Sequence, residues 1–288
     1  MKWGDESKSV SALTFGGPVE VVPGLSSFRI TGFCNILDSA NFAKGATLLP
    51  GNTTLRTGLY LWNGATGFTC GEGYALNMSG TDLWMDDATA FSVGSLVCTD
   101  DCRILGGPLG NAVCGRATIA GITQSDPNGE EQVLTIDSSA QIGPVHVTSK
   151  LALAPGKTAD ELPLFDDVGF ADGAVFDMQG NDLTVTGLTG FPTITNPGAL
   201  TIAGTWTIDQ ADILAGKCLN LGGKALTFAD GAKIVIVNRT TSSQQSFVIA
   251  QTTGGITGSP VTQGWRRCVE IKDGKLALSA RGLVLIFQ

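Results

Sequence analysis

Four pairs of adjacent carboxylates are the side chains of this sequence best suited to catalysis. Hydrolysis of a glycosidic bond needs two carboxylates about 5 to 9 Å apart, one of them buried enough to stay protonated as the general acid. Asp87 and Asp100 share one position of a repeated pattern, so stacked repeats would bring them close. That position is also a turn, where an exposed aspartate is ionised. We therefore expect turn residues and no catalytic site among Asp86–Asp87, Asp100–Asp101, Glu130–Glu131 and Asp166–Asp167.

Seven cysteines offer redox or metal chemistry, and Cys98 and Cys102 have the most informative spacing. They flank a Thr-Asp-Asp corner where other copies of the repeat hold one large and one small inward residue. Such a corner would supply the Cα separation of about 4.4–6.8 Å that a disulfide needs, so we predict a Cys98–Cys102 disulfide. Two reduced, buried thiols are the alternative. The sequence leaves open the pairing of Cys34, Cys70, Cys114, Cys218 and Cys268.

Signatures of metal, cofactor or nucleophile sites are lacking in the sequence. His146 is the only histidine and alternates with Val145 and Val147, which predicts an outward strand residue. No second cysteine pair completes a zinc site. An isolated corner aspartate supplies too few oxygens for calcium, and no phosphate loop or dinucleotide fingerprint is present. We expect neither a metal nor a cofactor.

Several of these residues belong to a nine-residue pattern that recurs six times. Its first, third and ninth positions are apolar or cysteine, its fifth is aspartate in five copies and serine in one, and its seventh is small. An alternating apolar start predicts a half-buried strand, and aspartate before a small residue predicts a turn. The copies are Cys34–Phe42, Leu83–Phe91, Leu96–Ile104, Leu134–Ile142, Val168–Phe176 and Leu226–Ile234, with corner aspartates Asp38, Asp87, Asp100, Asp172 and Asp230.

A second pattern, with Asn or Asp between apolar residues and then Gly, occurs at Leu76–Met85, Phe176–Val185 and Leu219–Phe228. Recurring strand-and-corner units predict a repeat architecture in which stacked units share one core. The copies of the first pattern are unevenly spaced, so we predict an all-β fold, a β-solenoid with irregular coils. Its expected division is N-terminal strands or a cap over 1–33, the solenoid over 34–263, and C-terminal capping or pairing strands over 264–288. The best helix candidate is Asp209–Ala215.

Composition excludes two classes of partner. A net charge of −8 with 15% charged residues disfavours nucleic acid, which needs clustered basic residues. No apolar run approaches the roughly 20 residues of a membrane helix, so we expect no membrane span. The residues after Met1 turn polar at once, without the apolar core of a signal peptide. This favours a start at a processed boundary over release by another route.

The two ends of a solenoid carry unpaired backbone groups that natural proteins usually cap or charge. The final apolar strand has neither charge nor proline, and Val10–Phe15 is similar. A second copy could add to such an edge by strand pairing. A terminal segment folded over the end as a cap is the alternative. The predicted self-association residues are Leu283, Val284, Leu285, Ile286 and Phe287.

The segment Phe176–Phe287 resembles autotransporter-associated β-strand repeat proteins, through Phe-Asp-Met-Gln-Gly-Asn-Asp-Leu-Thr-Val, Leu-Thr-Ile-Ala-Gly-Thr-Trp-Thr-Ile-Asp and Leu-Thr-Phe-Ala-Asp-Gly-Ala. The resemblance implies a right-handed parallel β-helix, export to the bacterial surface or the extracellular space, and a structural or adhesive role without catalytic residues. We expect a non-enzymatic subunit of a filament, coat or adhesin stalk that forms homo-oligomers. The first alternative is a carbohydrate-binding adhesin module that binds a surface glycan through exposed aromatic residues among Trp3, Trp62, Trp84, Trp206 and Trp265, of which Trp84 and Trp206 are expected to face outward. The second is a polysaccharide lyase or hydrolase.

Overall fold

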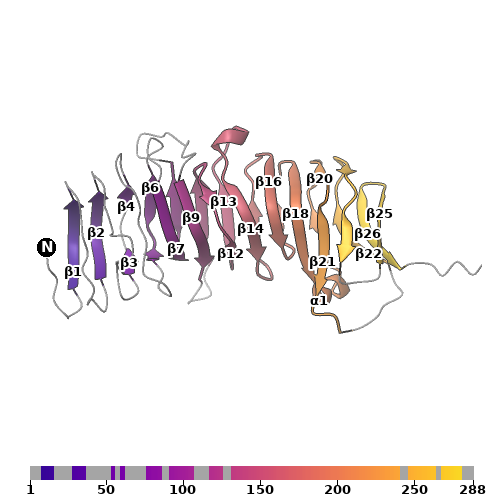
Figure 1. Cartoon of the computed structure of the whole chain (residues 1–288), viewed down its shortest axis with the longest axis horizontal. Coiled ribbons are helices and arrows are strands. Elements are labelled where there is room, and N and C mark those ends of the chain that lie inside the picture. The colour runs from indigo at the N-terminus through magenta and orange to yellow at the C-terminus, as the bar shows by residue number, and fades with distance from the viewer. Residues whose placement is uncertain are drawn as a thin grey trace, which may run out of the picture. The chain divides into compact units, whose positions relative to one another are not determined.

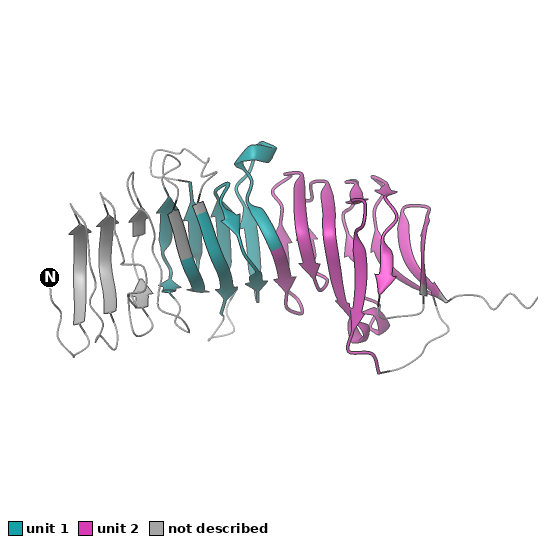
Figure 2. Ribbon diagram, in the orientation of Figure 1, with its two compact units in different colours: residues 1–166 teal, residues 167–288 magenta. Residues whose placement is uncertain are grey.

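The computed structural model describes residues 8–15, 28–36, 53–55, 59–61, 76–85, 91–106, 117–125, 131–240, 246–263 and 267–280. The chain divides into two compact units, Met1–Asp166 and Asp167–Gln288 (Figure 2). Strand β14 (Leu164–Phe170) carries the boundary between them. Strands are the predominant regular structure of the described residues, beside one α-helix and one 3-10 turn, and the large sheet is parallel, so the prediction of an all-β fold is confirmed.

The first unit is a series of short parallel strands (Figure 1). Strand β5 pairs with β7, and β7 pairs in turn with β9, so each strand pairs with one that lies further along the chain. A single-turn 3-10 helix, Ala159–Glu161, follows the strands. Its strands are β1 (Lys8–Phe15), β2 (Phe28–Ile36), β3 (Thr53–Leu55), β4 (Leu59–Leu61), β5 (Leu76–Ser79), β6 (Asp82–Met85), β7 (Phe91–Thr99), β8 (Cys102–Leu105), β9 (Ala117–Gln124), β10 (Val133–Asp137), β11 (Gln141–Ile142), β12 (Val145–Val147) and β13 (Lys150–Leu153).

The second unit continues the parallel pattern and adds a small second sheet with order β19-β22-β26-β25. In that sheet β26 pairs antiparallel with both β22 and β25. The strands are β15 (Val175–Asp177), β16 (Leu183–Thr189), β17 (Thr193–Thr195), β18 (Leu200–Asp209), β19 (Leu219–Asn220), β20 (Leu226–Phe228), β21 (Lys233–Val237), β22 (Phe247–Gln251), β23 (Ile256–Thr257), β24 (Val261–Gln263), β25 (Arg267–Lys272) and β26 (Lys275–Ala280).

Helix α1 (Gln210–Leu214) begins and ends where the sequence predicts a helix. Asp209 is its N-cap and accepts a hydrogen bond from the Ala211 N–H at 2.8 Å. A capping side chain of this kind satisfies one of the backbone donors left free by the first turn. Ile213 is buried and anchors the short helix to the core. The helix prediction is therefore confirmed.

The number of residues that separate two paired residues in the sequence, called the step here, varies along the chain. Leu183 pairs with Leu200, a step of 17 residues, whereas Cys102 pairs with Leu134, a step of 32. Because parallel pairing fixes only the strands, the extra residues of longer steps are accommodated in the connections between strands. Alternate residues of the strands point inward, as in β5, where Leu76 and Met78 are buried.

Trp206 corrects one expectation about outward aromatic residues. It is completely buried, and its indole N–H donates to the Gly190 carbonyl at 3.1 Å. Trp206 is in phase with the buried Leu200, Ile202 and Ile208, because inward residues of a strand recur every second position. Its neighbours in the chain are threonines, which face the other way. Trp84 is half-buried on β6.

The predicted domain limits of 1–33, 34–263 and 264–288 stay predictions. Within the last segment the structure describes an antiparallel hairpin of β25 and β26, in which β25 is the last strand of the small sheet. The predicted self-association residues Leu283, Val284, Leu285, Ile286 and Phe287 lie outside the described residues.

Candidate functional site

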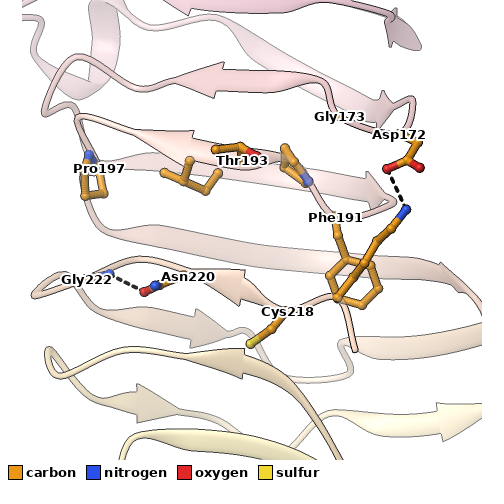
Figure 3. Close-up of a pocket in the computed structure, with 11 residues that line it drawn as sticks. Asp172, Gly173, Phe191, Thr193, Pro197, Cys218, Asn220 and Gly222 are labelled. Carbon is orange, nitrogen blue, oxygen red and sulfur yellow. Dashed lines mark hydrogen bonds and ion pairs between the residues drawn. The ribbon is translucent and has the colours of Figure 1, made fainter. Parts of the chain in front are cut away.

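A groove of about 580 Å³ opens on the second unit (Figure 3). It extends from the turn before β15, along β17, to the segment that contains β19. Aromatic, aliphatic, acidic, basic and amide side chains share its walls. The lining residues are Asp172, Gly173, Phe191, Pro192, Thr193, Ile194, Pro197, Lys217, Cys218, Asn220 and Gly222.

The groove follows a seam between the two sheets of the unit. Strand β17 pairs with β15 in the large sheet, and β19 pairs with β22 in the small one. Within the described residues, no backbone ladder joins β17 to β19. Pro192 and Pro197 flank β17, and proline cannot donate to a ladder, which confines it to strand edges. These two prolines explain why β17 is short and leaves one edge without a ladder.

An ion-pair cluster closes one end of the groove. The Lys217 Nζ lies 2.6 Å from Asp172 Oδ1 and 2.7 Å from Asp212 Oδ1. The hydrogen bond from Lys217 lowers the pKa of the Asp172 carboxyl, and the hydrogen bond to Asp172, followed by the one to Asp212, raises the pKa of Lys217. The Asp172 side chain is still 81% exposed, so it remains accessible to a ligand.

Phe191 forms the aromatic part of the wall. Its ring packs edge-to-face on the buried Trp206, with centroids 5.5 Å apart and planes at 71°. This geometry is one that aromatic pairs prefer, and it fixes the Phe191 ring in place. No local sequence pattern singles out Phe191, because its contact with Trp206 depends on the fold.

Cys218 and Asn220 line the side of the groove formed by the second sheet. Burial raises the pKa of the half-buried Cys218 thiol, and Lys275 partly opposes that shift. The Asn220 side-chain oxygen accepts from the Gly222 N–H at 2.9 Å. This bond orients the amide, so that its nitrogen is directed away from the turn.

The corner aspartates do not share one role. Asp172 and Asp230 lie in turns of two identical Phe-Ala-Asp-Gly-Ala segments, and each is followed by a glycine with positive φ. Asp172 belongs to the groove, whereas Asp230 is an exposed turn residue. Asp100 has a φ of 60° and accepts from the Ser79 hydroxyl at 2.8 Å. Asp38 and Asp87 lie outside the described residues.

In the second sequence pattern, an acidic or amide side-chain oxygen accepts a hydrogen bond from the backbone N–H two residues further on. Asp177 accepts from the Gln179 N–H at 3.3 Å, and Asn220 accepts from Gly222 in the same way. Both occupy the Asn-or-Asp position of that pattern. Its side chains stabilise the corner through a local turn, a role that the sequence analysis gave to the first pattern.

Cys98 and Cys102 are both completely buried, and both are free thiols in this structure. The predicted disulfide is therefore not formed here. The two side chains form a hydrogen bond with each other, and this bond, reinforced by burial, raises the pKa of Cys98. Cys102 also donates to the Met78 carbonyl at 3.5 Å. The described cysteines Cys218 and Cys268 are also free.

Three carboxylates of the four adjacent pairs, Asp100, Asp101 and Asp167, have structural contacts. Asp101 Oδ1 accepts from the Val133 N–H at 2.8 Å, on a neighbouring strand. Asp167 is partly buried, and this burial raises its pKa. Asp86, Asp87 and Glu130 lie outside the described residues. His146 is exposed, as expected.

Over the described ranges, no three or more His, Cys, Asp or Glu side chains are grouped so that they could hold a metal ion. None of the described helices has the length and apolar character needed to cross a bilayer. Comparison of the chain with protein-family models, with curated proteins and with solved structures finds no match.

Proposed function

We propose that this chain is an extracellular structural protein. In this proposal it is a right-handed parallel β-helix whose copies associate into a surface filament, coat or adhesin stalk, and it has no enzymatic activity. The observation that carries the proposal is the edge strand β1. Among the described strands, β1 pairs with β2 alone, whereas β2 also pairs with β3 and β4.

An unpaired strand edge presents backbone donors and acceptors that another strand can complete. The eight residues of β1 include a single charged residue, Lys8. The edge strand of the small sheet, β25, contains Arg267, Glu270 and Lys272 among its six residues. Charges on an edge discourage strand addition. The β1 edge is therefore the better site for a second copy of the chain.

The experiment measures the mass of the purified protein by light scattering over a wide concentration range, with electron microscopy of the same samples. We expect mass to rise with concentration. Pairing of β1 with β1 would give a closed dimer, and pairing with a different edge would give a filament. A protein that stays monomeric throughout overturns the proposal.

The test variant combines Ser9→Lys with Ser11→Lys on β1. The control variant is Glu270→Lys on β25, which changes the net charge by the same amount at the other edge. Added positive charge should weaken association at β1, and high salt should restore it, because salt screens repulsion between exposed charges. Restoration by salt also shows that the variant is folded. If the β1 variant associates like the unmodified protein, association does not use this edge.

A further inference from the structure

We propose that the groove between β17 and β19 binds a neutral saccharide chain. The site rests only on residues of the second unit, whereas the proposed self-association rests on β1. A failure of either proposal is therefore measured separately from the other.

The separation of the two strands decides against a peptide strand as the ligand. Cα atoms of β17 and β19 approach within 8 Å of each other. A strand inserted between them would hold them about 9.5 Å apart, twice the usual spacing of paired strands. A ligand therefore lies along the open groove without joining the ladder.

The walls of the groove have the mixed character that a sugar ring requires. Phe191, Ile194 and Pro197 provide apolar surface for the C–H faces of a sugar, and Phe191 is held rigid by Trp206. Asp172 offers a carboxylate acceptor, and the exposed Thr193 offers a hydroxyl that both donates and accepts. Few, well-placed polar groups on a mainly apolar wall are typical of ligand sites.

The charges around the groove favour an uncharged ligand. Lys217 is paired with Asp172 and Asp212, and Lys275 lies close enough to influence the Cys218 thiol. Of the residues that line the groove only Asp172 and Lys217 are charged, and their opposite charges cancel. No excess charge is left to compensate the phosphates of a nucleic acid or the carboxylates of a uronic-acid polymer.

The groove is suited to binding rather than cleavage. Glycoside hydrolysis needs a carboxyl that stays protonated as the general acid. The surroundings of Asp172 keep its carboxyl ionised, because Lys217 donates a hydrogen bond to it. Asp172 therefore accepts hydrogen bonds from sugar hydroxyls.

The experiment is affinity electrophoresis of the full chain in native gels that contain a neutral β-glucan, mannan or xylan, or polygalacturonate as the charged probe. We expect retardation by at least one neutral polymer and none by polygalacturonate. Asp172→Ala should weaken binding about tenfold or more, since a hydrogen bond to a charged group is lost. Asp230→Ala is the matched control, because it changes the identical turn outside the groove.

The rate at which Cys218 is alkylated reports whether the saccharide binds in the groove. A bound saccharide should slow alkylation of Cys218 while the exposed Cys268 reacts at an unchanged rate. The proposal is overturned if no neutral polymer retards the protein, if polygalacturonate retards it as strongly, or if Asp230→Ala weakens binding as much as Asp172→Ala. Retardation without protection of Cys218 also overturns it, because the saccharide then binds elsewhere.

Discussion

Asp172 and Lys217 are 45 residues apart in the chain, yet the Lys217 Nζ lies 2.6 Å from Asp172 Oδ1. The ion pair joins the turn before β15 to the segment after α1, on opposite sides of β17 in the sequence. It thus holds together the two segments that form the walls of the groove.

This ion pair should contribute to stability in a defined pH window. The pKa of Asp172 is lowered in the folded state, so its contribution is present above the unfolded value of about 3.9 and is lost as pH falls through the folded value. The pKa of Lys217 is raised, so its contribution is present below about 10.4 and is lost as pH rises through the folded value. Asp172→Asn should lower the melting temperature at neutral pH and leave it unchanged at strongly acidic pH. An equal deficit at both would contradict the assignment.

Two glycines allow steric and conformational costs to be separated. Gly231 and Gly258 both have positive φ, 82° and 90°. A Cβ on Gly231 would meet open space, but one on Gly258 would lie 2.1 Å from the Phe228 carbonyl oxygen. Gly231→Ala should cost about 1–2 kcal/mol, and Gly258→Ala about 1–3 kcal/mol more, as in overpacking. Urea unfolding of both variants measures the difference, and equal costs would contradict the close approach.

Gln124 should be a strong stabiliser of the first unit. It is 1% exposed, its amide nitrogen donates to the carbonyls of Gln132 and Lys150, and its oxygen accepts from the Thr148 and Ser149 N–H groups. Gln124→Leu removes these bonds and should cost about 3 kcal/mol, given about 1–3 kcal/mol for each buried group that loses its partner.

Urea unfolding checks this value, with the exposed Gln141→Leu as the control. Gln141→Leu should change stability by less than about 0.5 kcal/mol, as surface substitutions usually do. Similar losses in the two variants would show that the hydrogen bonds of Gln124 are not the cause.

The cysteines should differ widely in reactivity in the reduced protein. Cys98 and Cys102 are buried and the pKa of Cys98 is raised, whereas Cys268 is exposed. Because the thiolate is the reacting species, iodoacetamide should modify Cys268 before Cys98 and Cys102, which should react only after denaturation. Mass spectrometry of digests follows each site.

A non-reducing digest of protein purified without reductant tests the Cys98–Cys102 disulfide predicted from the sequence. A peptide linked through the two residues would establish the bridge. Early modification of Cys98 in folded, reduced protein would contradict the burial of the pair.

Local patterns predicted local structure well. The copy Leu96–Ile104 corresponds to the end of β7, the corner at Asp100 and the start of β8. The helix at Asp209–Ala215 was likewise identified, because both its cap and its apolar residue lie within a few positions.

The groove could not be predicted in the same way. Asp172 and Asp230 occupy identical pentapeptides, and only contacts from distant segments give them different surroundings. Phe191 gains its role from Trp206, which the sequence analysis placed outward. The signal that was available is the pair of prolines around β17, since proline on both sides of a three-residue strand indicates an edge.

The uneven steps between paired strands have a consequence for the evolution of this chain. Leu183 and its partner Leu200 are 17 residues apart in the chain, whereas Cys102 and its partner Leu134 are 32 residues apart, yet both pairs stay in parallel register. Insertions and deletions in these connections therefore leave the ladder intact. Selection can lengthen, shorten or replace one loop at a time, so surface properties can diverge rapidly between relatives while the strands beneath them change slowly.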